Sequence, residues 1–170
     1  ALFMLMDHLR STLKTSAQLV DVHLEYLPFA RQDRVTGTAL VSPFSLRTFC
    51  NLLQSHKNLG SVMIHDPHSE AAINLLQVPV RTVTQLSLIE DTDAMYQMMD
   101  DVDVVIAPDQ GAFKKAKAVA DRFELPLLVA NKERNPETRE IKLSFIQNAD
   151  LKGKTVFVPD DIVDYGGSVN

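Results

Sequence analysis

Residues 102–130, VDVVIAPDQGAFKKAKAVADRFELPLLVA, contain the pattern that decides the fold. The apolar run at 102–108 predicts a buried strand, and residues 112–123 have the spacing of an amphipathic helix. A second apolar run at 125–130 predicts another strand. A strand, a helix and a strand in this order are typical of a parallel sheet, so we predict an α/β fold.

The same alternation continues towards the N-terminus. Apolar residues recur at helical spacing over 2–13, and an alternating strand follows at 20–26. Ser42 followed by Pro43 predicts the start of a helix that runs to about His56, because serine caps helices and proline suits the first helical position.

Later segments complete the pattern. Asp91 is predicted to cap a helix that covers residues 91–101. Further strands are predicted at 61–66, 78–83, 141–146 and 155–159. The junction at 82–92 predicts two domains, one at 1–85 and one at 86–170.

Composition excludes several classes of protein. The 170 residues include 22 acidic and 17 basic side chains, a formal charge of -5, which argues against a nucleic-acid binder. No apolar run approaches the roughly 18–20 residues that span a bilayer, so we predict no membrane segment. Cys50 is the only cysteine, which predicts no disulfide framework and a cytoplasmic location. The abrupt ends predict a chain trimmed from a longer protein.

The motif that most strongly indicates a binding or catalytic function is VFVPDDIVDYGGSV at residues 156–169. A strand leads to Asp160 and Asp161 and then to a tight loop at 164–168. Glycine lets the backbone present N–H groups to a phosphate, while the carboxylates suit ribose hydroxyls or Mg²⁺. An acidic turn after an edge strand explains these residues equally well, so the motif alone does not decide the function.

Five motifs in order resemble one known family. The loop resembles the phosphoribosyl-diphosphate loop of ribose-phosphate pyrophosphokinases and type I phosphoribosyltransferases. Four further segments are similar to those of the first family: YLPFARQDR (26–34), MIHDPHS (63–69), IAPDQGAFKKAKAVA (106–120) and NKER (131–134). The resemblance covers nearly the whole chain, and five ordered motifs are more specific than any one of them.

The resemblance implies an ATP site and a metal site. Arg31 and Gln32 would contact ATP, as a guanidinium suits phosphate oxygens. His68 would bind the Mg²⁺–ATP complex with Asp66 close by, and Asp109 would be a second Mg²⁺ ligand. We interpret the other histidines as ordinary surface or core residues: His8, His23, His56 and His65. We likewise interpret three lysines as a solvated basic helix face: Lys114, Lys115 and Lys117.

The resemblance also implies a catalytic pair and a sugar-phosphate site. Lys132 would stabilise the transition state, and Arg134 would do so while also touching ribose 5-phosphate. We expect both on a mobile polar loop that closes over the site. The implied ribose 5-phosphate ligands are Arg134, Asp160, Asp161, Asp164, Tyr165, Gly166, Gly167 and Ser168. Tyr165 departs from the threonine that the family usually has there.

The implied fold is two type I phosphoribosyltransferase-like domains with mainly parallel sheets, both incomplete in this chain. The domain at 1–85 would bind ATP, and the domain at 86–170 would bind ribose 5-phosphate. The implied reaction moves the β,γ-diphosphoryl group of ATP to the 1-hydroxyl of ribose 5-phosphate, giving AMP and 5-phosphoribosyl 1-diphosphate. The family also implies a homo-oligomer, commonly a hexamer. Two alternatives stay open: a catalytically silent regulatory relative, and a type I phosphoribosyltransferase that consumes the diphosphate.

Overall fold

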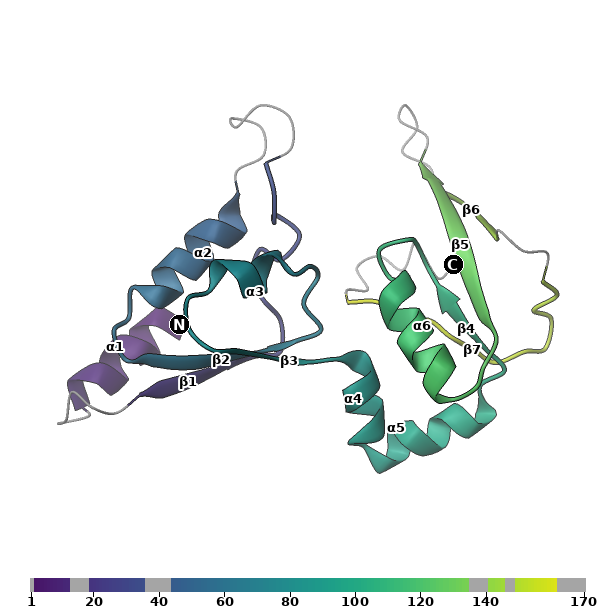
Figure 1. Cartoon of the computed structure of the whole chain (residues 1–170), viewed down its shortest axis with the longest axis horizontal. Coiled ribbons are helices and arrows are strands. Elements are labelled where there is room, and N and C mark those ends of the chain that lie inside the picture. The colour runs from purple at the N-terminus through teal and green to yellow at the C-terminus, as the bar shows by residue number, and fades with distance from the viewer. Residues whose placement is uncertain (1, 13–18, 36–43, 135–140, 146–148, 162–170) are drawn as a thin grey trace. The chain divides into compact units, whose positions relative to one another are not determined.

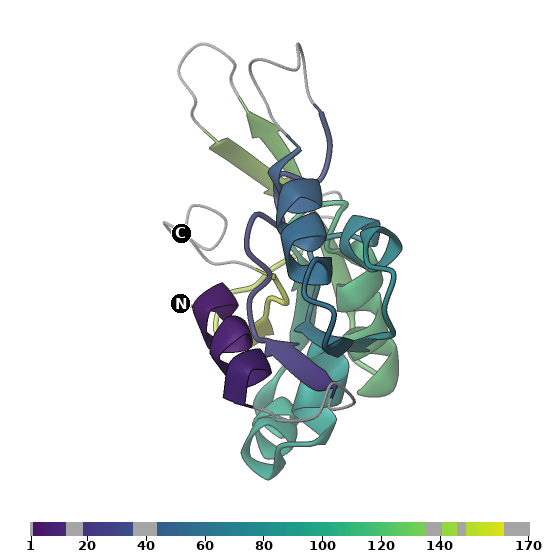
Figure 2. The same cartoon turned by 90° about the vertical axis from the view of Figure 1, so that its left-hand side faces the viewer.

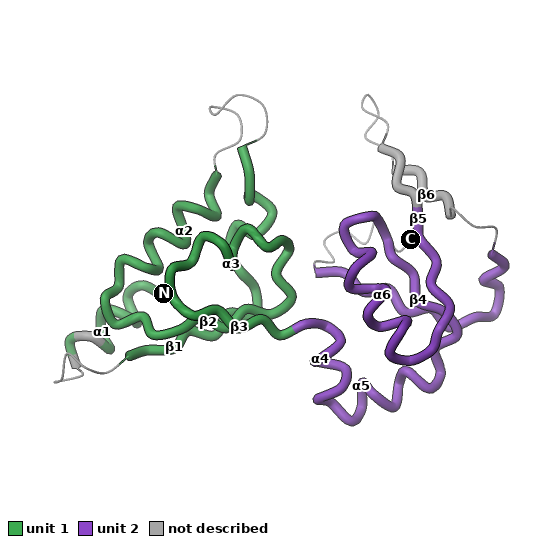
Figure 3. Tube along the Cα trace, viewed as in Figure 1, with its two compact units in different colours: residues 1–83 green, residues 84–170 purple. Residues whose placement is uncertain are grey.

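The computed structural model describes residues 2–12, 19–35, 44–134, 141–145 and 149–161. The chain forms two compact units, unit 1 at residues 1–83 and unit 2 at residues 84–170, which have different colours in Figure 3. The division falls two residues before the boundary expected from the sequence. Which ligand each unit binds stays a prediction.

Unit 1 contains a three-stranded parallel sheet with the strand order β1-β2-β3 (Figure 1). Its elements are α1 (Leu2–Thr12), β1 (Val20–Leu24), α2 (Ser45–Gln54), β2 (Leu59–His65), α3 (Ala71–Leu75) and β3 (Val80–Val83). Each pair of neighbouring strands is joined through a helix, as parallel pairing requires. The predicted strands at 20–26, 61–66 and 78–83 are thus confirmed, as is the N-terminal helix.

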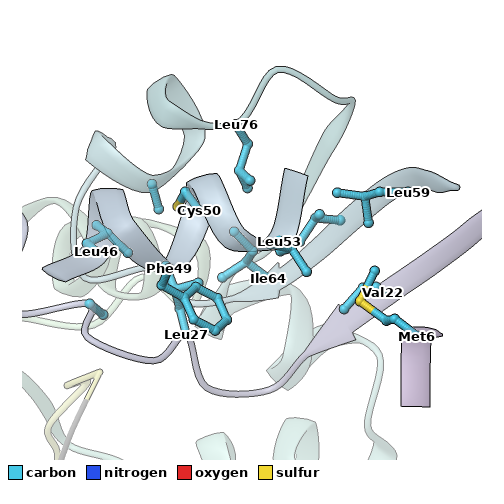
Figure 4. Close-up of a cluster of buried hydrophobic side chains, with 13 residues drawn as sticks. Met6, Val22, Leu27, Leu46, Phe49, Cys50, Leu53, Leu59, Ile64 and Leu76 are labelled. Carbon is cyan, nitrogen blue, oxygen red and sulfur yellow. The ribbon is translucent and has the colours of Figure 1, made fainter. Parts of the chain in front are cut away.

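The core of unit 1 lies between the sheet and its helices (Figure 4). α2 places one face in this core, including Leu53 and Cys50, which have no exposed surface. α1 lies beside β1 in Figure 2, and its Met6 joins the same cluster. Ten of the buried side chains are labelled in Figure 4: Met6, Val22, Leu27, Leu46, Phe49, Cys50, Leu53, Leu59, Ile64 and Leu76.

Unit 2 contains a four-stranded sheet with the order β6-β5-β4-β7. Its elements are α4 (Gln85–Glu90), α5 (Asp93–Met98), the 3-10 helix η1 (Met99–Asp101), β4 (Val104–Ala107), α6 (Phe113–Arg122), β5 (Leu127–Arg134), β6 (Ile141–Phe145) and β7 (Val156–Phe157). β4 pairs in parallel with both β5 and β7, whereas β6 is antiparallel to β5. The α/β fold with mainly parallel sheets is therefore confirmed.

The central strand of unit 2 is covered on both faces. All four residues of β4 are buried. Val105 and Ala107 belong to a cluster that includes residues of α4 and α6, while Val104 and Ile106 belong to a second cluster. A strand that buries both faces reads as a continuous apolar run, which explains the sequence pattern at 102–108.

The predicted helix start at Asp91 is wrong. Asp91 is the C-terminal cap of α4, a helix that the sequence analysis missed, and α5 begins two residues later at Asp93. Thr84 caps α4 instead, because its side chain accepts a hydrogen bond from the backbone N–H of Ser87 at 3.1 Å. The helix expected at 91–101 is present as α5 followed by η1, and α4 is an additional helix before it.

The predicted start of α2 lies outside the described residues, because Ser42 and Pro43 are not among them. The helix that the structure describes begins at Ser45, after Phe44, which makes no side-chain capping bond. None of the helices in the described ranges is long and apolar enough to span a membrane.

Candidate functional site

Two acidic segments meet at one edge of the sheet of unit 2. Asp109 follows β4, and Asp160 and Asp161 follow β7. β4 and β7 are parallel neighbours, with Val105 opposite Phe157. Asp109 and Asp161 each stand four residues beyond that pair, so the register brings the acidic segments together. The carboxyl edge of an open α/β sheet is where such folds bind their ligands.

Asp109 shapes the turn between β4 and α6. Its Oδ1 accepts a hydrogen bond from the backbone N–H of Ala112 at 3.0 Å. A Cβ added to Gly111 would lie 3.1 Å from that same oxygen, which is closer than side chains normally approach. Glycine at position 111 therefore leaves room for the Asp109 carboxylate to hold the turn.

The surroundings of Asp160 disfavour the negatively charged form of its carboxyl. Burial raises the pKa of its carboxyl above the ordinary value, and the neighbouring carboxyls of Asp161 and Asp109 raise it further. Its Oδ1 accepts a hydrogen bond from the backbone N–H of Asp161 at 2.9 Å, which partly offsets the rise. Gln85 also holds this segment by donating from its side-chain amide to the backbone carbonyl of Asp160.

Lys115 supplies a positive charge to this acidic edge. Its Nζ lies 3.6 Å from Oδ1 of Asp161, and both side chains are mostly buried, 19% and 15% exposed. The interpretation of Lys115 as part of a solvated face is therefore wrong. Lys117 does match that interpretation, since it is half exposed and pairs with Asp121 one helical turn later.

A signal for Lys115 was present in the sequence. Ala112, Ala116, Val119 and Ala120 form the buried stripe of this segment. Lys115 stands three residues after Ala112 and four before Val119, which places it on the same stripe. A lysine at an inward position needs a partner of opposite charge, and this requirement predicts a contact such as that with Asp161.

The candidate ATP segment of unit 1 is a compact turn. The backbone N–H of Gln32 donates to the carbonyl of Phe29 at 2.8 Å, and Phe29 has a left-handed φ of 62°. The carbonyl of Gln32 in turn accepts from the N–H of Leu46 in α2 at 3.3 Å. Arg31 and Gln32 are both exposed, so their side chains are accessible to a ligand.

The candidate metal segment follows β2. Asp66 has a left-handed φ of 34°, and its N–H donates to the carbonyl of Val83 at 2.8 Å. Such a backbone is uncommon outside glycine, although aspartate tolerates it better than most residues. His68 lies two residues further on and is exposed.

The two segments of unit 1 are joined by Asp33, which the sequence analysis did not single out. Its side chain is 6% exposed, and Arg34 donates to its Oδ1 at 3.1 Å. Burial alone would raise the pKa of Asp33, but hydrogen bonds from the Ser69 side chain and from Arg34 outweigh burial and hold it below the ordinary value. The ARQDR turn is thereby fixed to the segment that carries His68.

The described residues contain no group of three or more histidine, cysteine, aspartate or glutamate side chains arranged to hold a metal ion. Mg²⁺ commonly takes only one or two protein carboxylates, with water and substrate phosphates supplying the other ligands. The donor chemistry of Asp109 and Asp66 is compatible with that mode of binding. The Mg²⁺ assignment stays a prediction.

The expectation that Lys132 and Arg134 lie on a loop is wrong. Both belong to β5, which extends to Arg134 and pairs with β6, with Lys132 opposite Leu143 and Arg134 opposite Ile141. Backbone pairing across the two strands explains how a charged segment can be a strand. The expected phosphate loop, Asp164, Tyr165, Gly166, Gly167 and Ser168, lies outside the described residues.

A family comparison identifies the second half of the chain. Residues 82–170, just over half of the sequence, match the phosphoribosyl transferase domain. The match includes the acidic edge formed by Asp109, Asp160 and Asp161, and it extends over the glycine loop.

Individual relatives match most of the chain. The ribose-phosphate pyrophosphokinase of Saccharolobus solfataricus is 26% identical over 99% of this chain and 55% of its own length. That of Bacillus caldolyticus is 27% identical over 92% of this chain and 47% of its own. The chain thus spans about half the length of these curated relatives.

A solved structure has a similar fold. The crystal structure of phosphoribosylpyrophosphate synthetase from Mycobacterium smegmatis matches 98% of this chain and 51% of its own, with a TM-score of 0.75 and 26% identity. The fold described above and the order of the motifs therefore agree with one family.

Proposed function

Because the chain belongs to the ribose-phosphate pyrophosphokinase family of phosphoribosyl transferase domain proteins, we propose that its protein transfers the β,γ-diphosphoryl group of ATP to ribose 5-phosphate. The 1-hydroxyl of the sugar attacks the β-phosphorus, the bond to the α-phosphate oxygen breaks, and AMP leaves. The product is 5-phosphoribosyl 1-diphosphate, a precursor for nucleotide biosynthesis. We further propose that the protein works in the cytoplasm as a homo-oligomer, with each unit resembling a type I phosphoribosyltransferase domain.

The observation that carries the proposal is the convergence of Asp109, Asp160 and Asp161 at the carboxyl edge of β4 and β7. In the proposed site, Asp160 and Asp161 accept hydrogen bonds from the ribose hydroxyls. The backbone of residues 164–168 holds the 5-phosphate. Lys115 reduces the repulsion between this acidic edge and an anionic substrate.

The proposed ATP site uses unit 1. Arg31 and Gln32, both exposed, bind the triphosphate, and the bond between Asp33 and Ser69 keeps their turn next to His68. Such fixed positioning matters because diphosphoryl transfer relies on alignment and on charge neutralisation more than on covalent chemistry with the protein.

Mg²⁺ is the proposed cofactor. Asp109 would hold it in unit 2, and His68 with Asp66 would hold it at a separate site in unit 1. When bound, it would neutralise charge on the phosphate oxygens. Lys132 and Arg134, both in β5, supply cations, Lys132 for the transferring group and Arg134 also for the sugar phosphate.

The test is a discontinuous assay of AMP formed from ATP, Mg²⁺ and ribose 5-phosphate. We expect AMP only when the sugar phosphate is present, and at least about 100-fold less with Lys132→Met, the range seen when one transition-state cation or donor is removed. Glu133→Gln is the matched control on the same strand. Turnover that instead requires a nucleobase and 5-phosphoribosyl 1-diphosphate would identify a transferase. No turnover in any mixture would contradict the proposal in favour of a silent regulatory relative.

A further inference from the structure

Two histidines on neighbouring strands of unit 1 are in direct contact. The register pairs His23 of β1 with Met63 of β2, so His65, two residues beyond Met63, projects from the same face of the sheet. Their Nε2 atoms lie 2.6 Å apart, and their ring centroids are separated by 4.6 Å. His23 is exposed and His65 is half-buried, so the pair is open to solvent.

The contact restricts the tautomers of the two rings. A hydrogen bond between two Nε2 atoms requires one of them to carry the proton and the other to present its lone pair. Moving that proton to Nδ1 of the same ring leaves both Nε2 lone pairs aimed at one point, with no net gain or loss of protons. Neither histidine is among the residues proposed to bind ATP, Mg²⁺ or ribose 5-phosphate, although His65 directly precedes Asp66.

From this geometry we propose that His23 and His65 form a two-imidazole binding site for a late first-row divalent cation, Cu²⁺ or Zn²⁺. This proposal goes beyond the proposed function and does not depend on it. Two imidazole nitrogens about 2.0–2.1 Å from a metal in tetrahedral geometry lie roughly 3.3 Å apart. The present separation of 2.6 Å therefore has to widen by less than about 1 Å, a change within reach of side-chain rotation.

The ligand chemistry selects the cation. A pair of imidazoles suits copper and zinc, whereas each proposed Mg²⁺ site includes a carboxylate, the oxygen ligand that Mg²⁺ prefers, so the two kinds of site take different metals. Met63 and Asp21 lie on the same face of the sheet by register. Asp21 accepts a hydrogen bond from Ser61 at 2.6 Å, and its negative charge favours a cation on this face. Water would fill the remaining coordination positions.

The test is a titration of the metal-free chain with Cu²⁺ or Zn²⁺ against a competing chelator of known affinity. We expect one equivalent to bind, and His23→Gln and His65→Gln each to weaken that binding by roughly tenfold or more, since even outer partners of metal ligands contribute this much. His8→Gln is the control for an exposed histidine elsewhere. His68→Gln is the control for the proposed Mg²⁺ segment, and both controls are expected to bind the metal as the wild-type chain does.

A second measurement does not depend on variants. In the wild-type chain, substoichiometric Cu²⁺ should broaden the imidazole proton resonances of His23 and His65 before those of the other three histidines. Binding that survives both His23→Gln and His65→Gln, or that disappears in His68→Gln alone, would overturn the proposal, as would the absence of any bound equivalent. These readouts involve neither ATP nor ribose 5-phosphate, so their failure is distinct from a failure of the proposed reaction.

Discussion

The buried carboxylate of Asp33 accepts a hydrogen bond from the side chain of Ser69, and this bond joins the turn after β1 to the turn after β2. The segments are far apart in sequence, and each carries residues proposed to bind Mg²⁺–ATP. The bond therefore sets the spacing between Arg31 and His68 within unit 1. Asp33 acts through the positions of other residues, and its own oxygens are engaged by Ser69 and Arg34.

Replacing Asp33 with alanine should reduce stability. The substitution leaves the partner Ser69 without its buried acceptor, and a lost bond of this kind costs about 1–3 kcal/mol. Urea unfolding followed by circular dichroism measures the free energy of unfolding. Arg34→Ala is the matched control because its side chain is 71% exposed, and it should cost less than about 0.5 kcal/mol. Equal losses in the two variants would contradict the assigned role of Asp33.

The stabilisation by Asp33 should depend on pH. Its pKa in the folded chain is below the ordinary value of 3.8, so between the two pKa values the unfolded chain binds more protons. The stabilisation by Asp33 is therefore complete above the pKa that its carboxyl has in the unfolded chain. It is lost as the pH falls through the pKa that the carboxyl has in the folded chain. Urea titrations at several pH values below 5 should show the difference between wild type and Asp33→Asn shrinking with acidification. A difference that stays constant over this range would be inconsistent with the assignment.

Asp160 should show the opposite behaviour. Its pKa is raised by burial and by the neighbouring carboxyls, so its ionisation costs stability as the pH rises from the unfolded pKa through the folded pKa. Asp160→Asn removes that cost, and we expect the melting temperature at neutral pH to rise by roughly 1–2 °C. The same variant should bind ribose 5-phosphate more weakly, a trade of function against stability. A lower melting temperature together with unchanged binding would contradict both assignments.

The pairing of Lys115 with Asp161 can be tested against a lysine on the same helix. Lys115→Met leaves an unbalanced negative charge at the acidic edge, so the KM for ribose 5-phosphate should rise at least about threefold, with a smaller change in the KM for ATP. Lys117→Met removes only an exposed pair, for which the expected change is negligible. Steady-state kinetics with each substrate varied in turn gives both values. Equal effects of the two substitutions would contradict a specific role for the Lys115–Asp161 contact, and would mean that only the net charge of α6 affects substrate binding.

Much of the fold could be predicted from local patterns in the sequence. The apolar run at 104–107 and the amphipathic segment 113–122 became β4 and α6, because a buried central strand and a half-buried helix have distinct periodicities. The strand at 127–134 was predicted too short. Its charged C-terminal end is part of the strand because its backbone pairs with β6. The polarity pattern of the side chains does not indicate such pairing.

Helix boundaries were predicted less well. The acidic residue at position 91 has the chemistry of a helix cap, but Thr84 caps an earlier helix, and the chain turns at Asp91 before α5 begins. Several neighbouring residues could serve as caps here, and tertiary packing chooses between them. α4 is an example, because its Ile89 is completely buried in the core of unit 2.

The motifs of the candidate site could be predicted from the sequence, but the contacts that support them could not. Asp109, Asp160 and Asp161 converge because parallel strands end at the same edge, which follows from the α/β pattern. The bonds of Asp33 to Ser69 and of His23 to His65 join residues about 40 positions apart. Such contacts depend on strand register, which no local pattern specifies.

The most direct test of the central claim follows the phosphates of ATP by ³¹P nuclear magnetic resonance during incubation with ribose 5-phosphate and Mg²⁺. Transfer of a diphosphoryl group predicts that AMP and a sugar bearing a 1-diphosphate appear together in equal amounts. The release of ADP with a singly phosphorylated product would contradict the account, as would an ATP spectrum that does not change while the chain remains folded.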